Sequence, residues 1–575
     1  MKRHTLFAFA CAGVLALTAV GLPLRAADEP IDYDALNKIR TQGLLPANSQ
    51  VMEISSWLTD VHGPRLSGSP NILKAGEWAV AKMKEWGLDN VALEPWPADP
   101  ANANNGFPRG WSNDKFYLAA VAPQAFPIPG TPAAWTPGTN GLVRGEVVLV
   151  TETTEADLRA KYSGGRLKGK WVITAPAPDV AAFWTPPAAR FTRDELDRME
   201  SPVRTIEFGM TPPGGRQAAP PPPAQPVAGQ PGQRAGAPAA GPPAAQPGGR
   251  GGQGAAAPPF TRNEFFRAEG VLGLISTQAR GHGIYTIGGG NRTADPATLL
   301  TTITIPAEQY GRIARMVAKG LAVTLEGDIR NTYHPNPLMF NVVGEIRGTD
   351  MADELVMLGA HFDSWHASTG ATDNAAGSAA MLEAMRILKQ SGITLRRTVR
   401  IALWNGEEQG LIGSRLYVNR HFGGGRGGGR GGPPTPPTPL HAKFSGYFNI
   451  DNGTGAIRGV YLQQNPAVAP IFRAWMEPFR SIGMTHLNAG NTGGTDHQSF
   501  DGAGLPGFQF IQDEIEYDSM THHTNLDSYE RLQPEDMRRN ATIAAAFAFL
   551  TANREERLPR KPATPLPAGG RGGGQ

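Results

Sequence analysis

The chain has 575 residues, of which 40% are hydrophobic, and its formal net charge is +3. This length exceeds that of one ordinary domain, so we expect two or more domains, each with a hydrophobic core. So small a net charge, with no basic patch interleaved with aromatic residues, argues against a nucleic-acid-binding protein.

The N-terminus has the pattern of a secretory signal. A positively charged start precedes an apolar run over residues 6–20, and small residues suited to cleavage follow. The alternative is a membrane anchor, but the run is shorter than the ~20 apolar residues that a span requires. We therefore predict a signal peptide over residues 1–26 and a secreted or periplasmic protein without stable membrane insertion. The single cysteine, Cys11, lies in this segment, so no disulfide is expected in the mature protein.

After the signal, the periodicity first favours helices and then short strands. Val51, Ile54 and Leu58 recur at helical spacing. Between about residues 116 and 330, β-like runs alternate with Gly and Pro. Residues 211–259 interrupt this part and are rich in Pro, Ala, Gly and Gln. That stretch has too few bulky apolar side chains to offset its chain entropy, so we predict that it is disordered.

From about residue 336, strand and helix patterns alternate. Residues 355–358, 399–404 and 444–450 are typical of strands, and residues 374–389 are typical of a helix. This alternation predicts an α/β fold with a mostly parallel central sheet and helices on both faces.

Carboxylate and imidazole side chains follow the ends of the predicted strands, except that Asp373 opens the helix after the first of these strands. They are, in chain order, His361, Asp373, Glu407, Glu408 and Asp451. A lone His after a strand is usually structural, and a Glu-Glu pair is usually solvated. Ligands of open α/β sheets, however, bind at the carboxyl ends of the strands. We therefore expect all five groups to converge on one edge of the sheet.

These groups are the ligand types of a two-metal site. Zinc accepts imidazole and carboxylate, and two metals ~3.5–4 Å apart can share a bridging carboxylate. Asp373 suits the bridge because the turn at its helix start fixes its backbone; it could also be the N-cap of that helix, and both roles could hold. Asp363, two residues after His361, points the same way on an extended backbone and can accept the other ring N–H of that histidine. Of Glu407 and Glu408, one can ligate while its neighbour faces the bound water.

The motifs resemble the M28 family of zinc exopeptidases, and their arrangement around the β-rich middle of the chain is most similar to the plasma glutamate carboxypeptidase (carboxypeptidase Q) and glutamate carboxypeptidase branches. The matched segments are 63–69, 359–365, 371–377, 403–414, 449–451, 494–497 and 522–527. The resemblance implies two zinc ions per chain, one held by His361 and Asp451, the other by Glu408 and His523, with Asp373 as the bridge. It also implies that Glu407 is the general base and that Asp363 orients His361.

Two further points rest on the resemblance. His523 is preferred to His522 as the ligand because the ligand of the family immediately precedes a Thr or Ser. Asp496 and His497 lie in a loop that approaches the substrate in the family, but they could equally serve loop structure.

The β-rich middle of the chain resembles a protease-associated domain inserted into the peptidase domain. We therefore expect a peptidase domain in two parts, over residues 27–115 and 331–558, with a protease-associated-like insertion over residues 116–330 between them. The signal peptide over residues 1–26 precedes the first part. Disorder is expected at residues 211–259 of the insertion, in a loop at residues 423–439 and in a tail over residues 559–575.

The resemblance implies an exopeptidase that acts on short peptides. An aminopeptidase or dipeptidase is favoured over a carboxypeptidase of the glutamate carboxypeptidase type. A free amine can sit near acidic metal ligands, whereas a terminal carboxylate needs a fork of Arg or Lys donors. A glutaminyl-cyclase-like transferase would use a single zinc, against which the intact His361 and Asp451 pair argues. A catalytically inactive binding module would lack ligands or the base, and none is missing. A homodimer stays open.

Overall fold

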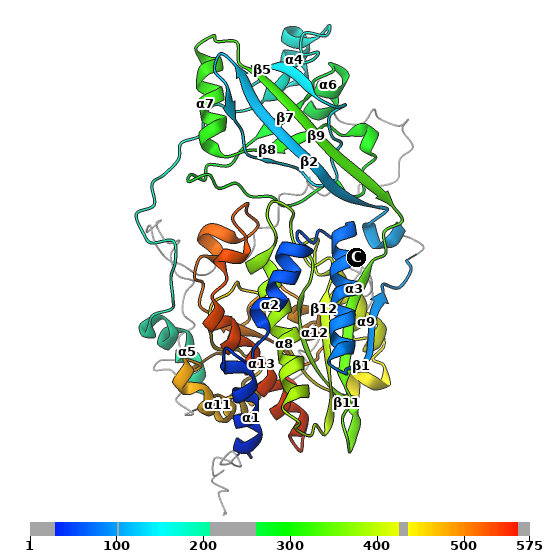
Figure 1. Cartoon of the computed structure of the whole chain (residues 1–575), viewed down its shortest axis with the longest axis vertical. Helices are drawn as coiled ribbons and strands as arrows, with labels where there is room; N and C mark the ends of the chain where they lie inside the picture. Colours follow the sequence, from blue (N-terminus) through cyan, green and yellow to red (C-terminus); the bar gives the residue numbers. More distant parts are fainter. Residues whose placement is uncertain (1–28, 100–102, 208–259, 425–434, 562–575) are drawn as a thin grey trace, which may run out of the picture.

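A computed structural model describes residues 29–99, 103–207, 260–424 and 435–561 (Figure 1). The predicted signal peptide, the stretch 211–259, most of the predicted loop 423–439 and most of the tail lie outside the described residues. Within the described residues, no helix is both long and apolar enough to cross a membrane.

The lower body in Figure 1 is built on an eight-stranded sheet. Its strands are, in spatial order, β1 (Asp89–Pro95), β10 (Phe340–Ile346), β12 (Arg397–Trp404), β11 (Met351–His361), β13 (Phe444–Asn449), β16 (Gly507–Gln512), β14 (Ile457–Tyr461) and β15 (His486–Asn488). The four central strands β12, β11, β13 and β16 are parallel to one another, and antiparallel pairs flank them. The predicted α/β class is confirmed, with a mixed sheet that is parallel at its centre.

Helices cover both faces of this sheet because its strands carry buried side chains on both faces. Along β11, Val356 and Leu358 belong to one hydrophobic core, while Leu355 and Met357 belong to another. This alternation follows from the two-residue period of a strand. The first core packs against α1 (Tyr33–Leu44), α2 (Val51–Ser56), α3 (Pro70–Glu85), α8 (Ala376–Gln390), α11 (Ala469–Met476) and α13 (Pro534–Asn553). The second packs against α9 (Ile412–His421), α10 (Pro439–Lys443) and α12 (His497–Asp501).

The upper body is a second eight-stranded sheet, inserted between β1 and β10 (Figure 1). Its strands are, in spatial order, β3 (Phe126–Pro127), β2 (Arg109–Ala122), β9 (Thr324–Pro335), β5 (Val143–Leu149), β6 (Trp171–Ile173), β7 (Gly273–Ser276), β8 (Thr302–Thr304) and β4 (Thr131–Pro132). Helices α4 (Glu155–Tyr162), α6 (Arg262–Ala268) and α7 (Ala307–Ala318) accompany the sheet. The entering strand β2 and the leaving strand β9 pair antiparallel over their lengths, so both connections to the lower body lie side by side.

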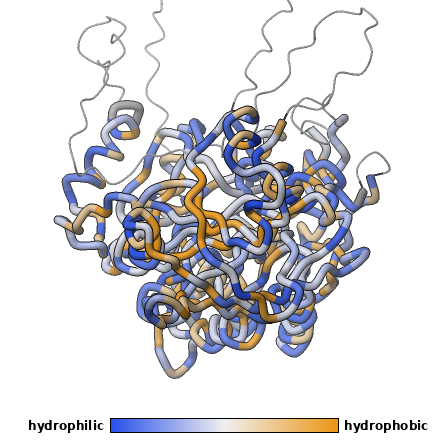
Figure 2. The backbone as a smooth tube through the Cα atoms, turned by 90° about the horizontal axis from the view of Figure 1, so that it is seen from above, coloured by the Kyte–Doolittle hydropathy of each residue, from blue (hydrophilic) through white to orange (hydrophobic). Residues whose placement is uncertain are grey.

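One part of the insertion returns to the lower body. Helix α5 (Arg193–Glu207) packs against β15 and α11, and Figure 1 shows it on the flank of that body. His486 of β15 lies 3.2 Å from the Asp197 carboxylate of α5. Seen from above in Figure 2, hydrophobic segments gather near the centre and hydrophilic ones lie around the periphery.

Candidate metal centre

The predicted site residues meet at the carboxyl edge of the parallel strands. His361 is the last residue of β11, and Glu407 and Glu408 lie in the turn that follows β12. Asp451 lies two residues beyond the end of β13. The side chains of His361, Asp373 and Asp451 are all buried. The predicted convergence on one edge is therefore what the structure shows, and it follows from strands that all run the same way.

Asp373 lies at the centre of this cluster, and each of its carboxylate oxygens faces a different histidine. Its Oδ1 lies 3.1 Å from Nε2 of His361, which in turn lies 3.1 Å from Oδ1 of Asp451. Its Oδ2 lies 3.3 Å from Nε2 of His523, which in turn lies 2.9 Å from Oε2 of Glu408. The cluster thus consists of two sets of three donors that share one carboxylate.

These donor sets fit metal ions. Tetrahedral zinc with ligands at about 2.0–2.1 Å separates its ligand atoms by roughly 3.3 Å, close to the four separations above. Asp373 Oδ2 and Glu408 Oε1 are also buried without a hydrogen-bond partner. A buried anionic oxygen without a partner is costly, and a cation would satisfy both atoms.

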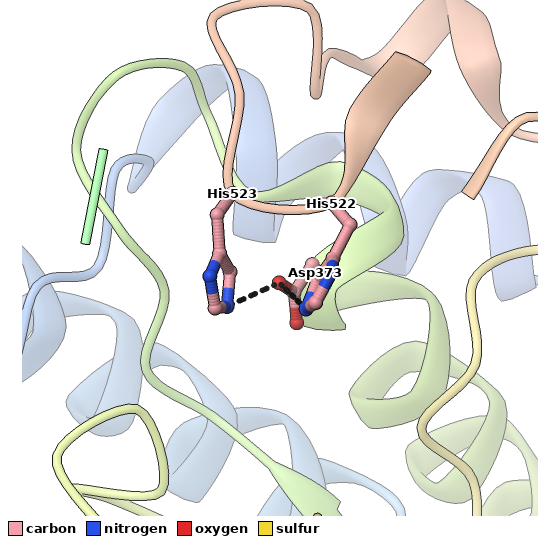
Figure 3. Close-up of side chains that lie close together, drawn as sticks. All are labelled: Asp373, His522 and His523. Atoms are coloured by element: carbon pink, nitrogen blue, oxygen red, sulfur yellow. Dashed lines mark ion pairs between the residues drawn. The ribbon is translucent and has the colours of Figure 1, made fainter. Parts of the chain in front are cut away.

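Of the two adjacent histidines, only His523 contacts both carboxylates. Nε2 of His522 lies 4.0 Å from Asp373 Oδ2, and its ring packs on Tyr517 at a centroid distance of 4.9 Å. Figure 3 shows both imidazoles directed towards Asp373 from the same loop. The geometry therefore agrees with the preference for His523, which stays a prediction until metal binding is measured.

Asp373 is not the N-cap of the helix that follows it. It lies inside the short turn Ala371–Ala375 with φ −129° and ψ 83°, and α8 begins only at Ala376. The side chain of Asn374 instead accepts a hydrogen bond from the N–H of Gly377, at 2.9 Å. The N-cap alternative for Asp373 is therefore wrong, and its carboxylate is free to face the two histidines.

The backbone around Asp373 is held by Asp527, whose role the sequence did not reveal. One carboxylate oxygen of Asp527 accepts from the N–H and the hydroxyl of Thr372, at 2.6 and 2.8 Å. The other accepts from the N–H of Asp373, at 3.2 Å. Burial raises the pKa of Asp527 to about 7. The one available signal was its place in the matched segment 522–527.

Asp363 contacts His361 differently from our expectation. Nδ1 of His361 donates to the main-chain carbonyl of Asp363 at 2.9 Å, while the Asp363 carboxylate lies 3.9 Å away. That carboxylate instead accepts from the hydroxyl of Ser67 at 2.8 Å and from the N–H groups of Glu407 and Glu408 at 3.1 and 3.4 Å. Because Nδ1 of His361 is bonded to the Asp363 carbonyl, Nε2 is the ring nitrogen that can bind a metal. The Asp363 carboxylate holds the Glu407-Glu408 turn.

A buried arginine, also missed from the sequence, holds the backbone beneath the site. The guanidinium of Arg65 donates to four main-chain carbonyls, those of Phe362 and Leu58 at 2.8 Å, Gly370 at 2.9 Å and Thr369 at 3.0 Å. Burial lowers the pKa of Arg65 to about 10, so it stays charged near neutral pH. It links the segment that bears His361 to the segment that bears Asp373.

The carboxylates of the cluster perturb one another. Burial raises the pKa of Glu407 well above its usual value, and the charges of Asp451 and Asp496 raise it further, although His361 opposes them. Burial and the charge of Asp373 likewise raise the pKa of Glu408. Buried carboxylates that raise one another's pKa values in this way favour a bound divalent cation, which would be the largest local charge in the cluster.

Asp496 and His497 have different surroundings. Asp496 is buried near the cluster, and burial raises its pKa to about 8. Nε2 of His497 lies 2.8 Å from the side-chain amide of Gln463 and 3.1 Å from the carbonyl of Thr492. The structural alternative therefore suits His497, whereas Asp496, in its charged form, raises the pKa of Glu407.

Comparisons with known proteins agree with this geometry. Residues 341–548 match the sequence model of peptidase family M28. Mouse carboxypeptidase Q is 27% identical over 266 residues, which are 46% of this chain and 53% of that protein, so the chain spans about half the length of this relative. Human carboxypeptidase Q is 22% identical over 520 residues, covering 89% of this chain and 88% of that protein.

A solved structure shows the same fold. A peptidase M28 precursor from Shewanella amazonensis aligns with 92% of this chain and 98% of its own, at 22% identity and a TM-score of 0.57. The sequence match over residues 341–548 is to the model of peptidase family M28. The resemblance inferred from the motifs is confirmed.

Proposed function

We propose that this protein is a zinc-dependent exopeptidase with two metal positions, acting on short peptides. The observation that carries the proposal is Asp373, whose two carboxylate oxygens each face one histidine–carboxylate pair. The match of residues 341–548 to family M28 supports a peptidase, and the relatives named carboxypeptidase Q support an exopeptidase.

The proposed ligands divide into two sets around that bridge. His361 and Asp451 would hold one zinc, and Glu408 and His523 would hold the other. When bound, zinc polarises a carbonyl and lowers the pKa of water towards ~7. The hydrogen bond from Nδ1 of His361 to the carbonyl of Asp363 fixes the ring for this purpose.

Glu407 would move the protons of the reaction. Its backbone N–H is held by the carboxylate of Asp363 at 3.1 Å, so the turn that carries it is fixed against the sheet. Burial raises its pKa well above the usual value, which suits a group that takes a proton from water and returns it to the leaving amine. Asp363 acts through its neighbours as a positioning residue.

The preferred substrate end is the free amino end. The cluster is rich in carboxylates, which attract an amine without further residues. Arg65, the buried cation beneath it, already donates to four carbonyls and is not free to bind a substrate carboxylate. Carboxypeptidase action is the second candidate, and the names of the relatives favour it.

Two tripeptides distinguish these candidates, one with a blocked amino end and one with a blocked carboxyl end. Hydrolysis of the carboxyl-blocked peptide alone supports the aminopeptidase. Hydrolysis of the amino-blocked peptide alone refutes it and supports the carboxypeptidase.

Two further features complete the proposal. We propose a secreted or periplasmic location from the pattern of residues 1–26. We also propose that the inserted body, expected over residues 116–330 and built between Arg109 and Pro335 in the structure, is a protease-associated-like domain.

A further inference from the structure

The inserted body contacts the very loop that carries His523. This loop, residues 513–527, follows β16 and is called the His523 loop below. Two separate segments of the insertion lie against it, residues 187–191 and residues 280–288. Neither segment belongs to the lower sheet, so the position of this loop is set partly from outside the peptidase body.

Residues 187–191 hold the beginning of the His523 loop. Ala189 and Ile515 exchange both main-chain hydrogen bonds, each at 2.8 Å, as an isolated antiparallel bridge. The hydroxyl of Ser519 donates to the carbonyl of Pro187 at 2.6 Å. This end of the loop is therefore paired to the insertion by its backbone.

Residues 280–288 hold the metal-binding end. The N–H of Ile287 donates to the carbonyl of His523 itself at 2.8 Å, and the N–H of Asn525 donates to the carbonyl of Tyr285 at 3.2 Å. The side chain of Asn525 accepts from the N–H of Tyr285 at 2.9 Å and donates to the carbonyl of Gly283 at 3.1 Å. His523 is thus bonded to the insertion directly and again two residues later.

The guanidinium of Arg280 adds a third contact between the insertion and the His523 loop. Arg280 donates to the carbonyl of Ser519 at 2.7 Å and to the hydroxyl of Thr286 at 3.1 Å. One side chain therefore ties the middle of the His523 loop to segment 280–288.

His523 needs such support more than the other ligands do. His361 ends a central strand and is buried, whereas the His523 side chain is 29% exposed and its backbone φ is +58°. A non-glycine residue in the left-handed region persists only where its surroundings fix it. The hydrogen bond from Ile287 and those of Asn525 help to fix it here.

We propose that the inserted body is a structural part of one metal position: segment 280–288 sets the place of His523, with Asn525 as the positioning residue. The inference rests on the proposed metal-binding function. Partners that orient a metal ligand typically change metal affinity about 10- to 100-fold when removed. The insertion should therefore affect the metal held by His523 and Glu408 but not the one held by His361 and Asp451.

The test is a zinc titration of the full-length protein against a competing chelator, which yields both dissociation constants. Asn525→Ala removes the two side-chain hydrogen bonds to segment 280–288. The matched control is Asn553→Ala, because Asn553 accepts from the N–H of Arg396 at 2.8 Å and donates to the carbonyl of Thr394 at 2.9 Å. It makes the same pair of bonds at the opposite edge of the sheet.

We expect Asn525→Ala to weaken the binding of the zinc ion held by His523 and Glu408 by roughly 10-fold or more and to leave the affinity for the other zinc ion unchanged. Asn553→Ala should change neither affinity. Added to His523→Ala, which should lose the same zinc, Asn525→Ala should have no further effect on the remaining zinc. Arg280 contacts the His523 loop from the insertion, so Arg280→Met should weaken the binding of the same zinc ion. Arg262→Met is its control, since Arg262 donates within the insertion to the carbonyl of Val150 at 2.9 Å.

The outcomes separate this inference from the proposed function. Unchanged affinities in Asn525→Ala and Arg280→Met overturn the inference, as does equal weakening of both zinc ions or a wild type that binds only one. A wild type that binds two zinc ions but cleaves neither tripeptide refutes the proposed peptidase. The zinc titration then still decides the inference.

Discussion

Asp527 provides a direct test of how the bridging carboxylate is held. We predict that Asp527→Asn weakens zinc binding although Asp527 is no proposed ligand. The amide keeps one oxygen for the N–H and hydroxyl of Thr372, but its NH2 group then faces the N–H of Asp373, now bonded at 3.2 Å. A buried N–H left without an acceptor costs about 1–3 kcal/mol. Since 1.4 kcal/mol corresponds to about tenfold, zinc affinity should fall roughly 5- to 150-fold.

The assay is a chelator-competition titration, with a thermal melt of the metal-free protein beside it. Glu383→Gln is the matched control, because the buried Glu383 carboxylate also accepts from a backbone N–H and a hydroxyl, those of Gln50 and Ser49, each at 3.0 Å. It should lower the melting temperature without changing zinc affinity. Zinc affinity within twofold of wild type in Asp527→Asn would refute the reasoning.

Two more predictions concern proton transfer and pH. Glu407→Gln should keep both zinc ions and lower kcat about 10²- to 10⁴-fold, whereas Glu408→Gln should weaken one zinc; near-normal turnover in Glu407→Gln contradicts the assigned base. Burial lowers the pKa of His366, which donates from Nε2 to the carbonyl of Pro132 at 2.8 Å, to about 4. Its contribution to stability is therefore complete above pH ~6.5 and lost as the pH falls towards 4, by about 3 kcal/mol in total. Denaturant unfolding at pH 7 and pH 5 should show a smaller fall for His366→Gln than for wild type, and equal falls would contradict the prediction.

The sequence predicted the parts of the site that depend on local pattern. Strand ends can be located from apolar runs, and parallel strands bring their ends to one edge. His361, the Glu407-Glu408 turn and Asp451 follow from that rule alone. The α/β class followed from the same alternation of strands and helices.

What the sequence did not reveal depends on contacts between distant segments. The Asp363 carboxylate turns away from His361 because Ser67, nearly 300 positions earlier, and the Glu407-Glu408 turn supply its donors. Asp527 clamps the turn of Asp373 from a loop that no periodicity marks. The insertion contacts the His523 loop through the side chains of Asn525 and Arg280 and through main-chain groups, and main-chain groups, which every residue possesses, leave no signal in the sequence.

Zinc stoichiometry tests most directly whether Asp373 would bridge two zinc ions, as we propose. Purified protein is reconstituted in zinc, dialysed and measured by elemental analysis, alongside His361→Ala. We expect two zinc ions per chain in the wild type and one in the variant. One zinc per chain in a wild type that cleaves peptides would contradict it.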